Sequence, residues 1–141
     1  MPASKPSFAQ VRSMILNVAP PVPVHGTALV VEDSPSDRLL LKRLLERMGC
    51  RCDAVGSGPE GVAAALSGAY DFVFMDVMMP GMDGWEATRF IHASLGPRSP
   101  FVVAVTALRS ARDRDRCAEA GMDYVLAKPV QREALSRLLH D

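Results

Sequence analysis

The sequence predicts an α/β fold, with a parallel sheet covered by helices on both faces. From about Thr27 onward, short runs rich in β-branched or aromatic residues alternate with longer amphipathic segments. This alternation is typical of parallel strands joined by crossover helices. The run Phe72 to Met75 is wholly apolar, as expected of a strand buried on both faces. We therefore predict five strand-plus-helix units.

The first two units show the local signals clearly. The strand Ala28 to Val31 precedes a helix capped near Ser34 to Ser36, in which apolar residues recur at helical spacing until a glycine ends it. The second strand is about Arg51 to Val55. Ser57-Gly58-Pro59 then opens an alanine-rich helix that ends near Gly68, because proline is tolerated in the first helical turn.

The last three units follow the same pattern. A loop rich in proline and glycine separates the third strand from a helix over about Trp85 to Leu95. The fourth strand, Phe101 to Val105, precedes a helix over about Arg112 to Ala120. That helix is crowded with charge, so we expect it to be loosely held. The fifth strand is Tyr124 to Leu126, and the fifth helix, Val130 to His140, has a leucine-rich face.

Length and composition restrict the class of protein. A chain of 141 residues is about one domain long and can bury one core. Its 16 basic and 16 acidic residues cancel, which gives no electrostatic case for a nucleic-acid partner. Three cysteines lack the spacing of a disulfide framework or zinc site. No apolar run reaches the roughly 20 residues of a membrane span, so we expect a cytoplasmic protein.

The first 26 residues differ from the rest. Prolines bracket a segment in which Ser7 and Gln10 form a capping box and four apolar residues have helical spacing: Phe8, Val11, Ile15 and Val18. We interpret residues 1–26 as an extension or linker with a possible short helix, since so short a helix is marginal alone. A docking or dimerising helix is the alternative. Residues 27–141 form the predicted domain.

Polar residues follow four of the predicted strands. Glu32 and Asp33 follow the first strand, Asp76 the third, Thr106 the fourth and Lys128 the fifth. In an open parallel sheet these ends meet at one edge, where ligands bind. Carboxylates 4 Å apart repel by about 1 kcal/mol in water and about 4 kcal/mol at a protein surface, so a cation is needed. Oxygen ligands favour Mg²⁺.

These residue types together favour phosphoryl transfer. Positioning and charge neutralisation supply most of the catalysis in that reaction. Asp76 would be the nucleophile that forms an aspartyl phosphate. Lys128 would hold one phosphoryl oxygen, and Thr106 could donate a hydrogen bond to another. Each residue alone is ordinary, because an aspartate at a strand end usually caps a turn. Their joint placement carries the prediction.

The same residues carry a resemblance to a known family. Asp76 opens a D-x-x-M-P-G-M-D-G loop, Ala107 follows Thr106, and a Lys128-Pro129 dipeptide comes soon after G-M-D. With the acidic pair Glu32-Asp33, this combination resembles the CheY-like receiver domains of two-component response regulators, from about Thr27 to His140. The resemblance implies a flavodoxin-like, doubly wound (βα)5 three-layer sandwich with strand order 2-1-3-4-5. It also implies a cis Lys128-Pro129 bond.

The resemblance assigns roles to individual residues. It implies that Asp33, Asp76 and the backbone carbonyl of Met78 hold Mg²⁺, with Glu32 assisting. It also implies cofactor binding by Met78 and Ala107. Asp76 is the implied phosphoacceptor.

The implied function is that of a phosphorelay receiver. A phosphohistidine on a histidine kinase or histidine phosphotransfer protein would supply the phosphoryl group, and a downstream effector would read the changed signalling face. Such a domain assists its own phosphorylation and dephosphorylation but is not an ordinary enzyme. We expect no direct nucleic-acid or membrane partner.

Three alternatives are weighed against this function. The chain could be a receiver fragment of a hybrid histidine kinase, or a receiver-like module that binds partners without phosphorylation. A haloacid dehalogenase-type phosphatase is disfavoured, because Met78 stands where that class has its second carboxylate.

One position departs from the family pattern. Many receiver domains carry an aromatic residue three positions before the lysine, where ring rotation accompanies movement of the threonine. This chain has Val125 there, and Tyr124 one position earlier. Because side chains alternate along a strand, Tyr124 should point to the opposite face. We therefore expect that the usual coupling between Thr106 and an aromatic ring does not operate unchanged.

Overall fold

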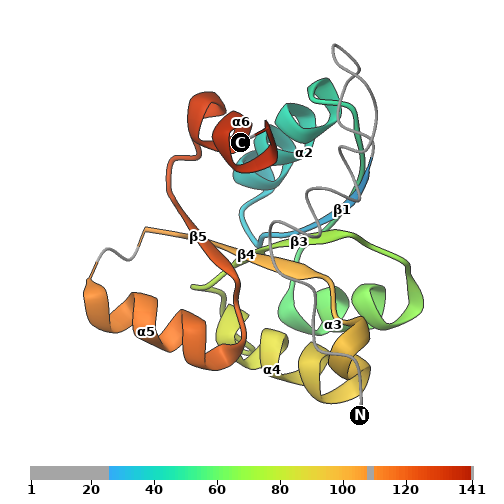
Figure 1. The fold of residues 1–141 in the computed structure, drawn as a ribbon, viewed down its shortest axis with the longest axis vertical. Coiled ribbons are helices and arrows are strands. Elements are labelled where there is room, and N and C mark those ends of the chain that lie inside the picture. The colour runs from blue at the N-terminus through green and yellow to red at the C-terminus, as the bar shows by residue number, and fades with distance from the viewer. Residues whose placement is uncertain (1–25, 108–109, 141) are drawn as a thin grey trace.

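Five parallel strands, each followed by a helix, make up the fold in the computed structural model, which describes residues 26–107 and 110–140 (Figure 1). The strands are β1 Gly26–Val31, β2 Cys50–Val55, β3 Phe72–Asp76, β4 Phe101–Thr106 and β5 Tyr124–Ala127. The helices are α2 Pro35–Arg47, α3 Gly58–Ser67, α4 Gly84–Leu95, α5 Ala111–Ala120 and α6 Arg132–His140. A short 3-10 turn, η1 Gly96–Arg98, follows α4.

The strands form one sheet in the order β2-β1-β3-β4-β5, which confirms the predicted topology. All four neighbouring pairs are parallel. From β1 the chain moves outward to β2, and it then returns to the other side of β1 through β3. The carboxyl ends of β1 and β3 therefore flank the point where the strand order reverses. Ligand sites of doubly wound sheets lie at such a point.

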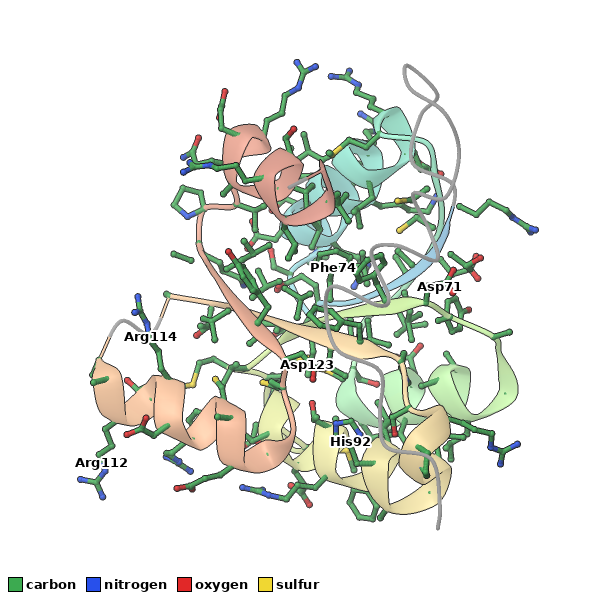
Figure 2. All side chains as sticks on the ribbon, viewed as in Figure 1. Asp71, Phe74, His92, Arg112, Arg114 and Asp123 are labelled. Atoms are coloured by element: carbon green, nitrogen blue, oxygen red, sulfur yellow. The ribbon has the colours of Figure 1, made fainter. Side chains whose placement is uncertain are left out.

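Helices cover both faces of the sheet, giving the predicted three layers. Figure 1 shows α2 and α6 on one face and α3, α4 and α5 on the other. The layer under α2 and α6 contains three aromatic residues of the central strands, Phe72, Phe74 and Phe101. The ring of Phe72 is tilted against that of Phe74 and meets that of Phe101 edge-on. Figure 2 shows Phe74 between the sheet and these helices. The opposite layer is built around Met75, Trp85 and Ile91.

Short polar side chains begin four of the helices. The side chains of Ser34, Ser57, Asp83 and Ser110 each accept a hydrogen bond from the backbone N–H three residues later. Such caps satisfy amides that the helix itself leaves unpaired. They also fix where each helix starts after its loop. The caps before α2 and α4 matter most for the site, because those loops carry Asp33 and Met78.

Some predicted element boundaries were wrong by one or two residues. β1 begins at Gly26 and β2 at Cys50, because these two residues pair across the sheet. α6 begins at Arg132, two residues later than predicted. The predicted extension, residues 1–26, lies outside the described residues except for Gly26. Across the described residues, no helix combines the length and apolar character needed to cross a bilayer.

The strand-five prediction is consistent with the packing. Val125 packs against the layer that contains Trp85, whereas Leu126 belongs to the layer of Phe74. Tyr124 is 41 % exposed and, by the alternation of side chains, lies on the face opposite to Val125. The three cysteines are free and buried: Cys50, Cys52 and Cys117. Burial raises the pKa of Cys50 to about 11 and that of Cys52 to about 12, which disfavours reactive thiolates.

Candidate active site

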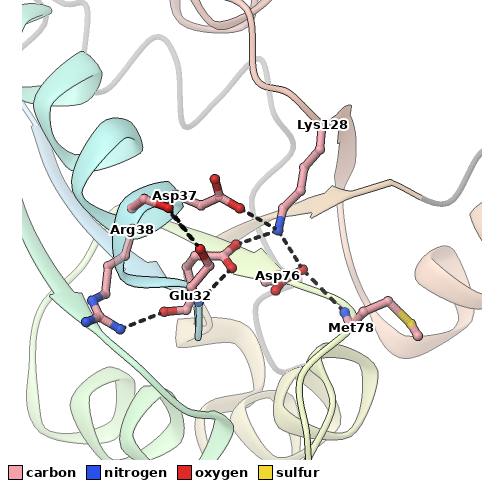
Figure 3. Close-up of polar contacts among 8 residues, drawn as sticks. Glu32, Asp37, Arg38, Asp76, Met78 and Lys128 are labelled. Carbon is pink, nitrogen blue, oxygen red and sulfur yellow. Dashed lines mark hydrogen bonds and ion pairs between the residues drawn. The ribbon is translucent and has the colours of Figure 1, made fainter.

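The candidate site occupies the carboxyl edge of the sheet. Glu32 and Asp33 directly follow β1, Asp76 is the last residue of β3, and Lys128 directly follows β5. Figure 3 shows the side chains of Glu32, Asp76 and Lys128 converging from these three places. The structure thus brings together residues that lie up to 96 positions apart in the sequence (128 − 32).

Three carboxylates make up the acidic part of the site. Glu32, Asp33 and Asp76 each offer one oxygen, and these oxygens all lie within 4.8 Å of one another. Glu32 and Asp76 are 3 % exposed, whereas Asp33 is exposed to solvent. An all-oxygen set that leaves positions open for water suits Mg²⁺, which keeps several waters when it binds to proteins. The donor set therefore fits the ion that the sequence predicted.

The ammonium group of Lys128 is shared among carboxylates. Its Nζ lies 2.8 Å from Glu32 Oε2, 3.3 Å from Asp76 Oδ1 and 3.7 Å from Asp37 Oδ2. Burial opposes the charged form, but the hydrogen bond to Glu32 and the negative charge of Asp76 outweigh it, so the pKa of Lys128 is raised. The lysine therefore remains a cation beside Asp76.

Asp76 itself sits in a position that disfavours its negative charge. Burial and the nearby charge of Glu32 raise the pKa of Asp76 to about 7, although Lys128 acts in the opposite direction. The backbone N–H of Met78 donates to Asp76 Oδ1 at 3.3 Å. A bound cation would favour the ionised carboxylate.

Gly84 allows the loop after Asp76 to turn tightly into α4. A Cβ at this position would collide with the backbone carbonyl oxygen of Asp76. The backbone N–H of Gly84 also donates to the carbonyl of Val77 at 2.9 Å. The first residue of α4 therefore packs against the backbone of Asp76 and Val77.

Thr106 lies at the same edge of the sheet, and the backbone of β5 and Lys128 pairs with it. It is 1 % exposed and ends β4, where it lies opposite Ala127 in β5. The backbone N–H of Lys128 donates to the Thr106 carbonyl at 2.9 Å. Ala107 follows as an exposed residue. The Lys128-Pro129 peptide bond is cis, as the resemblance implied.

The structure adds two site neighbours that the sequence analysis missed, Asp37 and Arg38. Asp37 faces Lys128, and Arg38 Nη1 donates to the backbone carbonyl of Glu32 at 3.0 Å. Both residues lie in the first turn of α2. Their closeness to Glu32-Asp33 in the sequence was the available signal, because a helix that starts right after the acidic pair keeps its first turn at the same edge.

Comparison with known proteins identifies the family. The sequence profile of the response regulator receiver domain matches residues 28–140. The chain belongs to this family. The sensor protein GacS of Pseudomonas syringae pv. syringae is 36 % identical over 132 residues, and the match covers 91 % of this chain. The sensor histidine kinase RcsC of Salmonella typhi is 41 % identical over 111 residues, covering 79 % of this chain.

The receiver domain is far shorter than these relatives. The matches cover 15 % of GacS and 12 % of RcsC. A hybrid signal transduction histidine kinase of Dictyostelium discoideum also matches, at 33 % identity over 127 residues and 7 % of its length. The chain therefore corresponds to one receiver domain of the kind that sensor histidine kinases contain.

Solved receiver domains share the fold. The receiver domain of the sensor histidine kinase PA1611 from Pseudomonas aeruginosa PAO1 is 36 % identical, with a TM-score of 0.74 over 82 % of this chain and 95 % of that one. That protein holds a magnesium ion in its active-site cleft. The chemotaxis protein CheY4 of Vibrio cholerae is 25 % identical, with a TM-score of 0.77 over 82 % of this chain and 97 % of that one.

Proposed function

We propose that this receiver domain accepts a phosphoryl group on Asp76, in a reaction that requires Mg²⁺. The observation that carries the proposal is the convergence of Glu32, Asp33 and Asp76 with the Lys128 ammonium at the edge of the sheet. Asp33, Asp76 and the Met78 carbonyl would hold the ion, with Glu32 assisting. When bound, Mg²⁺ supplies positive charge that stabilises the oxygens of the transferring phosphoryl group.

The donor would be a phosphohistidine. An oxygen of Asp76 forms a bond to phosphorus as the phosphorus–nitrogen bond of the donor breaks, and the imidazole keeps the electron pair and takes up a proton. Asp76 must be ionised for this attack, so its raised pKa makes a nearby cation important. Lys128 holds one phosphoryl oxygen, and the Thr106 hydroxyl donates a hydrogen bond to another.

Phosphorylation would act as a switch by shifting a conformational equilibrium. The new charge on Asp76 attracts Lys128 and Thr106, which draws the loops after β3 and β4 toward the site. Because α5 follows the loop after Thr106, its position responds. A downstream effector would bind one arrangement of this face better than the other.

The donor is proposed to be a histidine kinase or a histidine phosphotransfer protein. Beside Lys128 lies a groove of about 230 Å³ that is lined mainly by apolar residues of α2 and of the segment after β5. Leu40, which lines the groove, is 52 % exposed, and its neighbour in the sequence, Leu39, is 47 % exposed. Exposed apolar surface next to a reactive group favours a protein partner. The donor is proposed to be the same whether the domain stands alone or belongs to a hybrid kinase.

The test is phosphorylation by a small donor. Incubation with phosphoramidate and Mg²⁺ should add one phosphoryl group, which intact-mass spectrometry detects. No group should be added when the metal is chelated before the reaction. Asp76→Asn is the matched control and should remain unmodified. A wild-type protein that gains no phosphoryl group, or an Asp76→Asn variant that gains one equally well, would contradict the proposal. Partner binding without any phosphorylation would favour the binding-module alternative.

A further inference from the structure

Lys128 has a third carboxylate partner in addition to Glu32 and Asp76. The carboxylate of Asp37 lies 3.7 Å from Lys128 Nζ. Figure 3 shows it approaching from α2, whereas Glu32 and Asp76 approach from the strand ends. The three carboxylates that group as a metal site are Glu32, Asp33 and Asp76, without Asp37. Asp37 therefore faces the lysine from outside the acidic cluster.

The first turn of α2 fixes where Asp37 stands. Its backbone N–H donates to the Ser34 side chain at 3.4 Å, and the N–H of Arg38 donates to the Ser34 carbonyl at 2.9 Å. The guanidinium of Arg38 then reaches back to the carbonyl of Glu32. Gly56 leaves room for this guanidinium, because a Cβ there would lie 2.7 Å from Arg38 Nη1. The turn that carries Asp37 is thus tied directly to the backbone of Glu32.

A bound divalent cation would change the surroundings of Lys128. It would bind oxygens of Glu32 and Asp76, which are the two carboxylates closest to the ammonium group. It would also repel that ammonium group, since both carry positive charge. Asp37 remains available to Lys128, because it lies outside the acidic cluster. Without such a partner, the flexible lysine could swing away from Asp76.

We infer that Asp37 is a positioning residue that holds Lys128 beside Asp76 while a cation occupies the acidic cluster. This inference rests on the proposed function of Asp76. Asp37 does not itself touch the phosphoryl group; it keeps the ammonium where an incoming phosphoryl oxygen needs it. The Asp37 side chain is 53 % exposed, so its pairing with Lys128 should change the reaction rate only about two- to fivefold.

The test compares phosphorylation rates at saturating Mg²⁺ with phosphoramidate as donor. Asp37→Asn should slow modification of Asp76 about two- to fivefold. Glu46→Gln is the matched control, because it removes the same charge from the same helix at a residue paired with Lys42. Glu46→Gln and the charge-preserving Asp37→Glu should both react near the wild-type rate. Thermal unfolding of each variant checks that the fold is retained, since a purely structural role would lower stability without a selective effect on this rate.

A double-mutant cycle with Lys128→Ala, whose slower reaction is followed for longer, identifies the route of the effect. Asp37→Asn should cause no further loss in that background, because the residue it positions is gone. The inference is overturned if Asp37→Asn reacts like the wild type, if Glu46→Gln slows the reaction equally, or if the Asp37 effect persists without Lys128. A wild-type protein that is not phosphorylated overturns the proposed function and this inference together. A phosphorylated wild type with an unaffected Asp37→Asn variant overturns only the inference.

Discussion

Helices α2 and α5 each follow a loop that leaves the site, yet the two helices are held against the sheet in different ways. α2 buries Leu41 and Leu45 in the apolar layer that it shares with α6, and its first turn is bonded to Glu32. Of the described residues of α5, Cys117 and Ala120 are the buried ones, and Figure 2 shows Arg112 extending away from the sheet. The helix on the acidic side is anchored strongly, and the helix beyond Thr106 is anchored weakly.

Two side-chain contacts of α5 involve the same residue, Trp85 of α4. The indole N–H of Trp85 donates to Cys117 Sγ at 3.2 Å, and the guanidinium carbon of Arg116 lies 3.8 Å from the ring centre. Trp85 is also the second residue of α4, immediately after the loop from Asp76. An element with few buried contacts shifts at a small free-energy cost. Under the proposed function, the fixed edge would hold the ligands at the site and the weakly held helix α5 would change position when they bind.

Truncating a buried side chain should lower the stability of the protein much more in α2 than in α5. Leu45→Ala removes a side chain of α2 that is fully buried, and such truncations cost about 2–5 kcal/mol of unfolding free energy. Cys117→Ala in α5 removes a smaller group and should cost about 1 kcal/mol. Urea unfolding measures both. Equal losses for the two variants would remove the basis of the comparison.

The next effect concerns the acidic side and its dependence on pH. The folded protein raises the pKa of Asp76 from 3.8 to about 7. Ionisation of Asp76 therefore destabilises the fold progressively as the pH rises through that range. Asp76→Asn lacks this penalty and should be more stable than the wild type by about 1–3 kcal/mol above pH 7 without Mg²⁺. The gain should vanish below about pH 4, where the wild-type carboxyl is protonated in both states.

Thermal unfolding across this pH range checks the sign. Added Mg²⁺ should stabilise the wild type at neutral pH and so reduce the advantage of Asp76→Asn. A gain that grows as the pH falls would show that the environment of Asp76 has been misinterpreted.

The smallest effect concerns the contact between Arg116 and Trp85. Arg116→Gln removes the cation above the ring and should lower the unfolding free energy by about 0.5–1 kcal/mol. Arg112→Gln removes the same charge from the same helix one turn earlier, at an exposed residue whose side chain extends away from the sheet (Figure 2), and should change stability very little. If both variants lose the same unfolding free energy, the contact between Arg116 and the Trp85 ring does not specifically stabilise α5.

The strand ends were predictable from the sequence because burial leaves a strong pattern. The apolar run up to Asp76 and the polar residues after other strands placed Glu32, Asp33 and Lys128 at one edge, and the structure brings their side chains together. The first residues of β1 and β2 were missed, because Gly26 and Cys50 become strand through mutual pairing rather than through their own preferences.

The side-chain contacts of the helices were not predictable in the same way. The bond from Trp85 to Cys117 joins residues 32 positions apart, and it depends on how two helices pack on the sheet. The reach of Arg38 to Glu32 depends on a rotamer and on the space beside Gly56. Neither leaves a periodic signal in the sequence. These contacts nevertheless distinguish the strongly anchored helix α2 from the weakly anchored helix α5.

The different hold on helices α2 and α5 can be measured by hydrogen exchange with and without beryllofluoride, a phosphoryl mimic. In the presence of Mg²⁺ the mimic should bind at Asp76 and change the exchange rates of the backbone amides in α5 and in the 76–84 loop. The amides of α2 beyond its first turn should exchange at unchanged rates, because that helix is anchored by Leu41 and Leu45. A response confined to α2, or no response in α5 despite binding of the mimic, would contradict the account.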